Sequence, residues 1–293
     1  MALSKITDNS LNITDLTIAD DLSLKSDSAV LNFGADNDVT LTHVADTGLT
    51  LNTKLGVGGA TAGSQPAEAE DIIIGTTSST DNGMSIVTAN NSVGRFYFAD
   101  ATSGSAAYAG YMIYDHSVDT MQLGTATNTA IKIDGNGHVT KPKNPAFHVT
   151  GSTQTNINHN VDFYPQRGSS GAVIYDVGSD ITLSDNISFS PSDVNYFVAP
   201  VTGKYAFEFR ARFDNMPADI TYVASTLYTS NRQHGINMHS TNWMDATASY
   251  YSHQGTIIAD LDANDTAYVV LYLAGGTTGT DLNSHSFKGV LIG

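Results

Sequence analysis

Nine histidines and 29 acidic residues are the side chains in this sequence that could bind a metal ion or transfer protons. The two closest histidines, His234 and His239, are five residues apart, which suits neither one face of a helix nor one face of a strand. No His-Glu-x-x-His motif occurs, and no carboxylate stands at a ligand spacing from this pair. The histidines therefore indicate surface or interface positions, and no metal site is expected at them.

Two runs of Asp and Asn offer the hard oxygen ligands that calcium prefers, namely Asp36-Asn37-Asp38 and Asp260-Leu261-Asp262-Ala263-Asn264-Asp265. Neither run matches the twelve-residue calcium loop with its central Gly and terminal Glu. Turns closed by Asp and Asn side chains explain the same residues without an ion. No cofactor is expected, and calcium stays open as an alternative.

Motifs for catalysis are missing from the sequence. There is no Gly-x-Ser-x-Gly elbow, and Gly56-Val57-Gly58-Gly59 lacks the Lys-Ser/Thr of a phosphate-binding loop. The absence of cysteine excludes thiol catalysis, disulfides and thiolate metal sites. A pair of carboxylates for glycan cleavage is defined by its separation in space, which a sequence does not give. We therefore expect that the chain is not an enzyme.

A cluster of aromatic and histidine side chains is the better candidate site, because amphipathic aromatic rings are favoured recognition anchors. It lies between Asn237 and His253, in a segment that includes the only tryptophan. The predicted receptor-binding residues are His239, Trp243, Tyr250 and Tyr251. The alternative is that Trp243 and one of the tyrosines fill a hydrophobic core or a subunit seam, as aromatic residues in β-sandwiches usually do.

The composition predicts which elements carry these residues. Charged residues make up 14% of the 293 residues, and Ser, Thr, Asn and 26 Gly take their place, which favours strands and turns over helices. The net charge of −16 opposes binding to nucleic acid or to an anionic membrane. No apolar run approaches 18 residues, and the N-terminus lacks the apolar region of a signal peptide, so neither membrane insertion nor secretion is expected.

The chain divides into three expected regions. Residues 1–65 carry short alternating strands at 15–18, 21–24, 38–41 and 48–51, with apolar faces too thin for a monomeric core. Small and helix-breaking residues at 56–66 predict a linker, after which Ala67-Glu68-Ala69-Glu70 could form one helical turn. A middle β domain is expected at 66–143. Pro142 and Pro145 mark the boundary to an aromatic-rich β-sandwich at 144–293.

The third region resembles the C1q/tumour-necrosis-factor-like jelly roll. The residues that carry the resemblance are Phe147 near its start, Phe197-Val198-Ala199-Pro200-Val201-Thr202-Gly203-Lys204-Tyr205-Ala206-Phe207, Leu261-Asp262-Ala263-Asn264-Asp265-Thr266-Ala267-Tyr268-Val269, and Phe287-Lys288-Gly289-Val290-Leu291-Ile292. The second of these segments is similar to the family's F-x-A-P-x-x-G-x-Y-x-F, and the last to its F-x-G-x-L-I. The resemblance implies a homotrimer, and some members of the family bind calcium.

The N-terminal half resembles segments that recur in fibres of marine bacteriophages. The residues that carry this resemblance lie at 31–49, 96–100, 111–117, 121–124 and 133–137. Together the two resemblances imply an all-β, trimeric virion fibre, which residues 1–65 attach to other virion proteins and whose head meets a host-cell glycan or protein. Two alternatives stay open: a head fibre or capsid decoration protein without a receptor role, and a tailspike that cleaves glycans.

Overall fold

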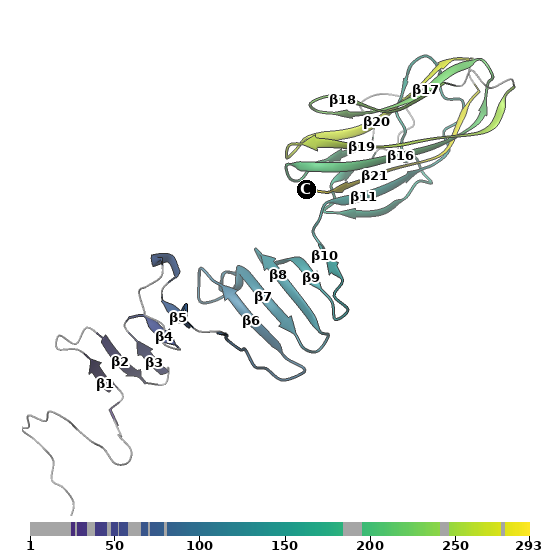
Figure 1. Cartoon of the computed structure of the whole chain (residues 1–293). Coiled ribbons are helices and arrows are strands. Elements are labelled where there is room, and N and C mark those ends of the chain that lie inside the picture. The colour runs from purple at the N-terminus through teal and green to yellow at the C-terminus, as the bar shows by residue number, and fades with distance from the viewer. Residues whose placement is uncertain are drawn as a thin grey trace, which may run out of the picture. The chain divides into compact units, whose positions relative to one another are not determined.

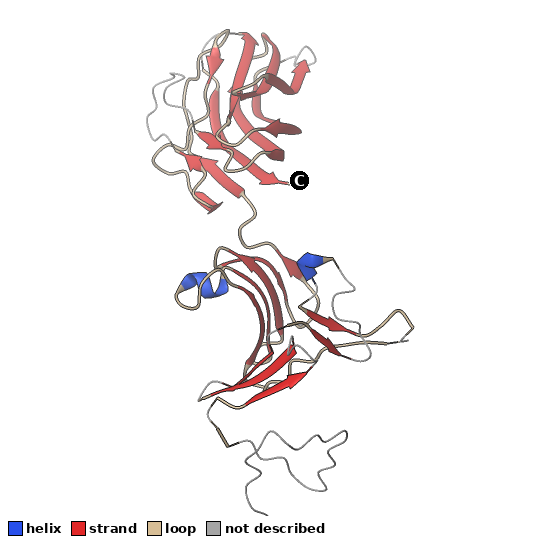
Figure 2. Ribbon diagram, turned by 90° about the vertical axis from the view of Figure 1, so that its left-hand side faces the viewer, coloured by secondary structure: helices blue, strands red, loops and turns tan. Residues whose placement is uncertain are grey.

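The computed structural model describes residues 25–26, 28–33, 39–45, 48–51, 53–57, 66–69, 71–78, 81–183, 195–240, 246–276 and 279–293. Among these residues the regular structure is β-sheet, with two short 3-10 turns, η1 (Ala67–Ala69) and η2 (Ser105–Tyr108), and no α-helix (Figures 1 and 2). The expected all-β fold class is confirmed. The chain forms two compact units, Met1–Ser85 and Ile86–Gly293, which are described separately.

The first unit contains two small sheets. Strands β1 (Val30–Phe33), β2 (Val39–Val44) and β3 (Gly48–Leu51) pair antiparallel, and β4 (Leu55–Val57) pairs parallel with β5 (Ile72–Ile74). Strands β2 and β3 confirm the segments expected at 38–41 and 48–51, and η1 confirms the helical turn after the linker. Residues 15–18 and 21–24 lie outside the described part of the chain. β4 and β5 lie on either side of residue 65, and the first compact unit extends to Ser85. The expected division of the chain into 1–65, 66–143 and 144–293 stays a prediction.

The second unit begins with a sheet that we name the middle sheet. It is an antiparallel meander in the order β10-β9-β8-β7-β6. Its strands are β6 (Val93–Phe98), β7 (Gly110–Asp115), β8 (Thr120–Thr125), β9 (Asn128–Ile133) and β10 (Val139–Thr140). Sequential strands that pair with their neighbours need only short hairpin connections, which the Gly- and Asn-rich turns of this segment supply.

The turn between β9 and β10 forms where the Asp-Gly-Asn-Gly sequence predicts it. Gly137 has a φ of 84°, which a residue with a side chain rarely adopts. The Asp134 carboxylate accepts hydrogen bonds from the backbone N–H groups of Asn136 and His138, both at 2.9 Å. The side-chain hydrogen bond between Asp134 and His138 is the largest cause that lowers the pKa of Asp134, and the two backbone bonds lower it further. The turn is thus closed by an Asp side chain, as Asx turns are.

The remaining strands form the head, a sandwich of two antiparallel sheets. Sheet I has the order β13-β11-β21-β16-β19, and sheet II has the order β14-β15-β20-β17-β18, with β12 added beside β20. The strands are β11 (Ala146–Gly151), β12 (Asp162–Phe163), β13 (Val173–Val177), β14 (Ile181–Thr182), β15 (Tyr196–Val198), β16 (Gly203–Met216), β17 (Ile220–Thr229), β18 (Gln233–Ser240), β19 (Ala248–Leu261), β20 (Thr266–Gly275) and β21 (Asp281–Leu291).

The path of the chain between the two sheets is that of a jelly roll. The long strands alternate between the sheets, except that β17 and β18 form a hairpin within sheet II. As a result the first strand, β11, pairs with the last, β21, and β15 pairs with β20. This nesting of early strands against late ones is the Greek-key connectivity that defines a jelly roll. The sandwich predicted for residues 144–293 is therefore confirmed.

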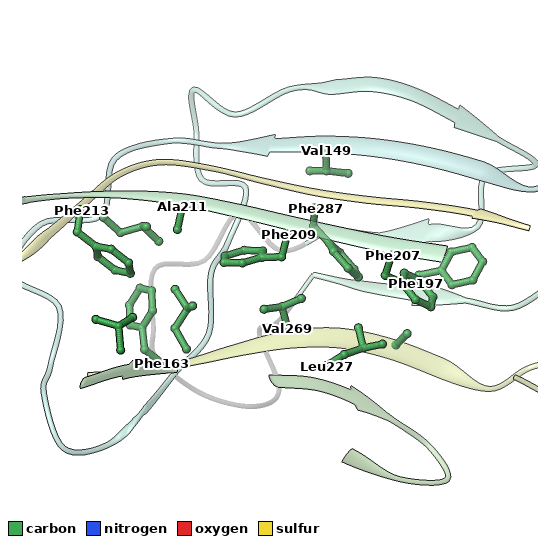
Figure 3. Packing of buried hydrophobic residues seen from close by; sticks show 14 of the residues in the cluster. Val149, Phe163, Phe197, Phe207, Phe209, Ala211, Phe213, Leu227, Val269 and Phe287 are labelled. Carbon is green, nitrogen blue, oxygen red and sulfur yellow. The ribbon is translucent and has the colours of Figure 1, made fainter. Parts of the chain in front are cut away.

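The core of the head lies between the two sheets. Strand β16 shows why: Tyr205, Phe207, Phe209, Ala211 and Phe213 occupy every second position, so one whole face of the strand is apolar and buried. Figure 3 shows Phe207, Phe209, Ala211 and Phe213 on the side of sheet I that faces Leu227 and Val269 of sheet II. Every residue of the hydrophobic core cluster belongs to the segment 147–287, so the head has a core of its own.

No helix in the described residues is long and apolar enough to cross a membrane.

Candidate functional site

Two of the four predicted receptor-binding residues lie on opposite faces of the same strand. Tyr250 and Tyr251 are consecutive in β19, and successive side chains of a strand point to opposite sides of the sheet. Tyr250 is 71% exposed on the outer face of sheet I, whereas Tyr251 is 8% exposed and its ring lies 6.3 Å from that of Phe213. Tyr251 is therefore a core residue, in line with the alternative that one of the tyrosines fills the core, and receptor binding at the four residues stays a prediction.

His239 is exposed at the end of β18 and is tied to Tyr251 from outside the core. Its Nδ1 lies 2.7 Å from the Tyr251 hydroxyl, with which it shares a hydrogen bond. Burial raises the pKa of Tyr251, so this hydroxyl keeps its proton at neutral pH. Trp243 lies in segment 241–245, outside the described residues. Of the four predicted anchors, the structure thus joins His239 to Tyr251 and separates both from Tyr250.

Tyr250 takes part in a different cluster at one end of sheet I. The Arg212 guanidinium carbon lies 4.7 Å from the centre of the Tyr250 ring, a cation–π distance. Arg212 also donates hydrogen bonds from Nε and Nη2 to the two carboxylate oxygens of Asp214, each at 2.8 Å. The bidentate pair holds the guanidinium in place over the ring. Tyr250 is therefore an ordered, exposed aromatic residue.

The outer face of sheet I also carries an apolar row that the sequence patterns did not single out. The register places Val290 and Ile258 on either side of Ala206, in adjacent strands. Ile258 is 61% exposed, and Val290 and Tyr175 are also exposed. These residues line an open groove of about 730 Å³. The sequence signal was the pair Ile257-Ile258, because two consecutive apolar residues in a strand place one of them on the outer face.

Charged side chains beside the row are paired with one another. Lys288 donates a hydrogen bond from Nζ to Oε1 of Glu208 at 2.8 Å, across neighbouring strands. His148 lies on the other side of Lys288, and its ring contacts that of Tyr175 with a centroid distance of 5.7 Å. Burial, followed by the positive charge of Lys288, lowers the pKa of His148. At neutral pH the groove therefore combines an apolar centre with a balanced ion pair.

The outer face of sheet II is rich in tyrosine, which is a second surface that the sequence patterns did not single out. Tyr228 and Tyr268 stack with their ring centres 5.5 Å apart, and Tyr222 and Tyr272 stack at 5.9 Å. Tyr164 lies beside Tyr268. The strands of this face alternate tyrosine with core residues, so all four strand tyrosines point away from the sandwich. Amphipathic tyrosine surfaces of this kind are common in protein recognition.

The acidic loop after β19 uses its oxygens within the protein. The Asp265 carboxylate accepts hydrogen bonds from the Asp262 backbone N–H at 2.9 Å and from the Asn231 side chain at 2.5 Å. Asp260 forms an ion pair with Arg232 at 3.3 Å. No group of three His, Asp or Glu side chains that could hold a metal ion occurs among the described residues. The other Asp/Asn run, at 36–38, lies outside the described part of the chain, and calcium stays open as an alternative to the expected absence of a cofactor.

One serine–histidine pair has the distance of a catalytic pair, but both residues are buried, so a substrate could not reach the serine. His253 Nε2 lies 3.0 Å from Ser225 Oγ, and both residues are at most 2% exposed between the sheets. A nucleophile must reach its substrate, and the core around this pair leaves no path for one. Desolvation lowers the pKa of His253 to about 4. The pair is a buried hydrogen bond of the core.

The comparisons with known proteins concern the head. No family model matches the chain, and no curated protein matches it. Among solved structures, the globular domain of zebrafish complement 1qA protein is 16% identical with a TM-score of 0.36, covering 51% of this chain and 98% of its own. An Eiger TNF from S. frugiperda is 11% identical with a TM-score of 0.37, over 52% and 94%. The vertex protein P5 of PRD1 is 12% identical with a TM-score of 0.36, over 51% and 98%.

Proposed function

We propose that this chain is a non-catalytic fibre subunit of a bacteriophage virion, which assembles as a homotrimer and attaches the particle to a host cell through its head. The observation that carries the self-assembly is the apolar row of Ala206, Ile258 and Val290 on the outer face of sheet I. No part of the described chain covers this row. An exposed apolar row framed by polar side chains has the composition of a subunit interface.

The position on a phage virion is supported by the resemblance of residues 31–49 and 96–137 to marine phage fibres. In this proposal residues 1–65 contact other virion proteins, and the head meets a glycan or protein of the host surface. The alternative of a head fibre or decoration protein would share the assembly and lack the receptor role. A glycan-cleaving tailspike is less favoured, because the only parallel strand pair among the described strands is β4 with β5, far from a long parallel β-helix.

We predict that the full chain has the mass of three subunits in solution. Three times 31.0 kDa is about 93 kDa, which light scattering on the purified protein would measure directly. Ile258→Asp should weaken the assembly at least tenfold, because it would bury a carboxylate in the apolar row. Gln254→Asp is the matched control, since it lies on the same face of β19 but outside the row.

A monodisperse monomer of the unmodified chain would contradict the assembly. An equal loss of assembly in both variants would show that net charge, rather than the apolar row, governs association.

Host attachment is tested with cells. The full chain should bind cells of a susceptible strain within a panel of marine bacterial isolates and compete with phage adsorption. Trp243→Ala should weaken cell binding without lowering the melting temperature, if Trp243 is a recognition anchor. Tyr251→Ala should instead lower the melting temperature, because Tyr251 is part of the core. Tyr108→Ala in the middle region is the control for loss of an exposed tyrosine. A chain that binds no strain and blocks no infection would favour the alternative without a receptor role.

A further inference from the structure

The two faces of the middle sheet differ sharply in chemistry. The register places Phe96 beside Met112, Met112 beside Leu123, and Leu123 beside Ile131, so one row of apolar side chains crosses four strands. We name this side the apolar face. Its large side chains are Phe96, Phe98, Met112, Tyr114, Met121, Leu123, Ile131, Ile133 and Val139. Residues 93–140 are all described, and none of the strand residues on this face is an Asp, Glu, Lys or Arg.

The opposite face is partly covered by the chain's own side chains. Tyr111 is 8% exposed and lies across Gly124, where an added Cβ would come within 2.1 Å of the tyrosine ring. Its hydroxyl forms a 2.9 Å hydrogen bond with Thr129, whose hydroxyl donates to Gln122. Tyr108, from the loop between β6 and β7, contacts Tyr97 on the same side. The charged strand residues of the middle sheet, Arg95, Asp115 and Lys132, are also on this face.

On the apolar face, within the described part of the second unit, Ile86 approaches Gly94, but seven of the nine large side chains are exposed. Met112 is 40% exposed and Phe98 is 71% exposed, although core positions of a sheet are normally buried. Four strands of six residues and one strand of two, at about 4.8 Å between strands and about 3.4 Å per residue, give a flat area of roughly 420 Å². That is as large as the largest apolar patch of a typical monomer, about 300 to 600 Å², and patches of this size are often functional.

The charge of the chain indicates which partner fits this face. At −16 per chain, copies repel one another through most of their surface, so they can meet closely only where acidic side chains are absent. The apolar face is such a place, whereas a charged partner would leave its own charges unpaired there. The same chain exposes a second apolar row on sheet I, and further copies of this chain would cover both.

We propose that the apolar face of the middle sheet is a self-association surface, which packs against the same face of other copies of this chain. The inference rests on the proposed self-assembly and adds a second subunit interface, which residues 93–140 form independently of the head. Association of identical apolar faces around a symmetry axis buries the same residues in every subunit.

The absence of cysteine allows a direct test in the full chain. Met112→Cys places one thiol on the apolar face, and Ile113→Cys places one thiol on the opposite face of the same strand. A short bismaleimide should link Met112→Cys chains covalently, with a yield at least tenfold above that of Ile113→Cys on a denaturing gel. Equal yields would overturn the proposal. So would a Met112→Cys thiol that is shielded from labelling yet forms no covalent dimer, because another segment of the same chain would then cover the face.

Ile258→Cys on sheet I separates this inference from the proposed function. Links at Ile258→Cys without links at Met112→Cys would support assembly through the head and contradict the second interface. Links at neither position, with a monomer mass, would remove both. A second pair of variants does not depend on crosslinking: Leu123→Glu should weaken assembly at least tenfold, and its neighbour Gln122→Glu, on the opposite face, should not. Unchanged assembly in Leu123→Glu chains with native circular dichroism would overturn the proposal.

Discussion

Acidification from pH 7 to pH 4 is expected to lower the free energy of unfolding of the head by about 6 kcal/mol, through two buried histidines. Burial lowers the pKa of both His253 and His285 from 6.5 to about 4. In the unfolded chain both rings take up a proton near pH 6.5, whereas the folded head keeps them neutral down to about pH 4. The contribution of the two neutral histidines to the free energy of unfolding is therefore fully present above pH 6.5. It is lost as the pH falls from 6.5 to 4, at about 3 kcal/mol for each histidine.

The surroundings of these histidines contain little that would stabilise their charged forms. His285 is enclosed by Val149, Phe209 and Phe287, and an added Cβ at Gly151 would come within 1.9 Å of its ring. The ring of His253 stacks beside that of Tyr251, and the nearby His239 further lowers the pKa of His253. No carboxylate contributes to either pKa, so protonation would leave a buried, unpaired cation.

The measurement is urea unfolding of the full chain at about pH 7, 5.5 and 4, followed by near-ultraviolet circular dichroism. The double variant His253→Gln/His285→Gln cannot titrate at these positions, so its unfolding free energy should change by several kcal/mol less over this range than that of the unmodified chain. Comparing the change with pH within each protein removes any fixed cost of the substitutions and the common effect of the acidic residues. His43→Gln is the control, since His43 is exposed in β2. The same pH dependence in the double variant would exclude the two histidines as its cause.

The alternation of residue types was enough to predict the head, because most of its strands have one apolar face. In β16 the large residues from Tyr205 to Phe213 occupy every second position, and the structure buries all of them. The motif residues that carry the resemblance have the same explanation. Phe147, Phe197, Phe207 and Phe287 are far apart in the sequence and meet in a single aromatic cluster.

Where neighbouring residues are all aromatic or all apolar, the sequence does not give the direction of the side chains. Tyr250 and Tyr251 are equivalent by type, and the pairing of Tyr251 with Phe213 of β16 decides which of them enters the core. The run Phe96-Tyr97-Phe98 has the same ambiguity: alternation places the two phenylalanines on one face, and only the register with β7 shows that it is the face of Met112. Long-range strand register thus determines which residues form both candidate assembly surfaces, and a local signal such as Ile257-Ile258 indicates only that one residue of the pair faces outward.

Removal of the Phe147 ring is expected to cost the head about 3 to 5 kcal/mol of unfolding free energy, the usual effect of Phe→Ala in a closed core. Phe147 is fully buried, stacks on Phe197 with ring centres 5.0 Å apart, and meets Phe287 edge to face at 5.0 Å. It thereby joins β11, the first strand of the head, to β15 of the opposite sheet and to β21, the last strand. The measurement is urea unfolding of the full chain at a fixed protein concentration, because assembly also contributes to stability.

A substitution at Gly289 tests whether packing of the Phe147 ring causes the expected loss of stability. An added Cβ at Gly289 would lie 2.4 Å from the Phe147 ring and 2.9 Å from the Phe207 ring, so Gly289→Ala should itself cost about 1 to 3 kcal/mol by overpacking. In the Phe147→Ala background the methyl group enters space that the ring has left, and its cost should fall by at least about 1 kcal/mol. Gly235→Ala in β18 is the control, since nothing lies within 4 Å of its added Cβ. If the costs of Gly289→Ala and Phe147→Ala simply add, the close contact between the glycine and the aromatic cluster does not determine the stability of the head.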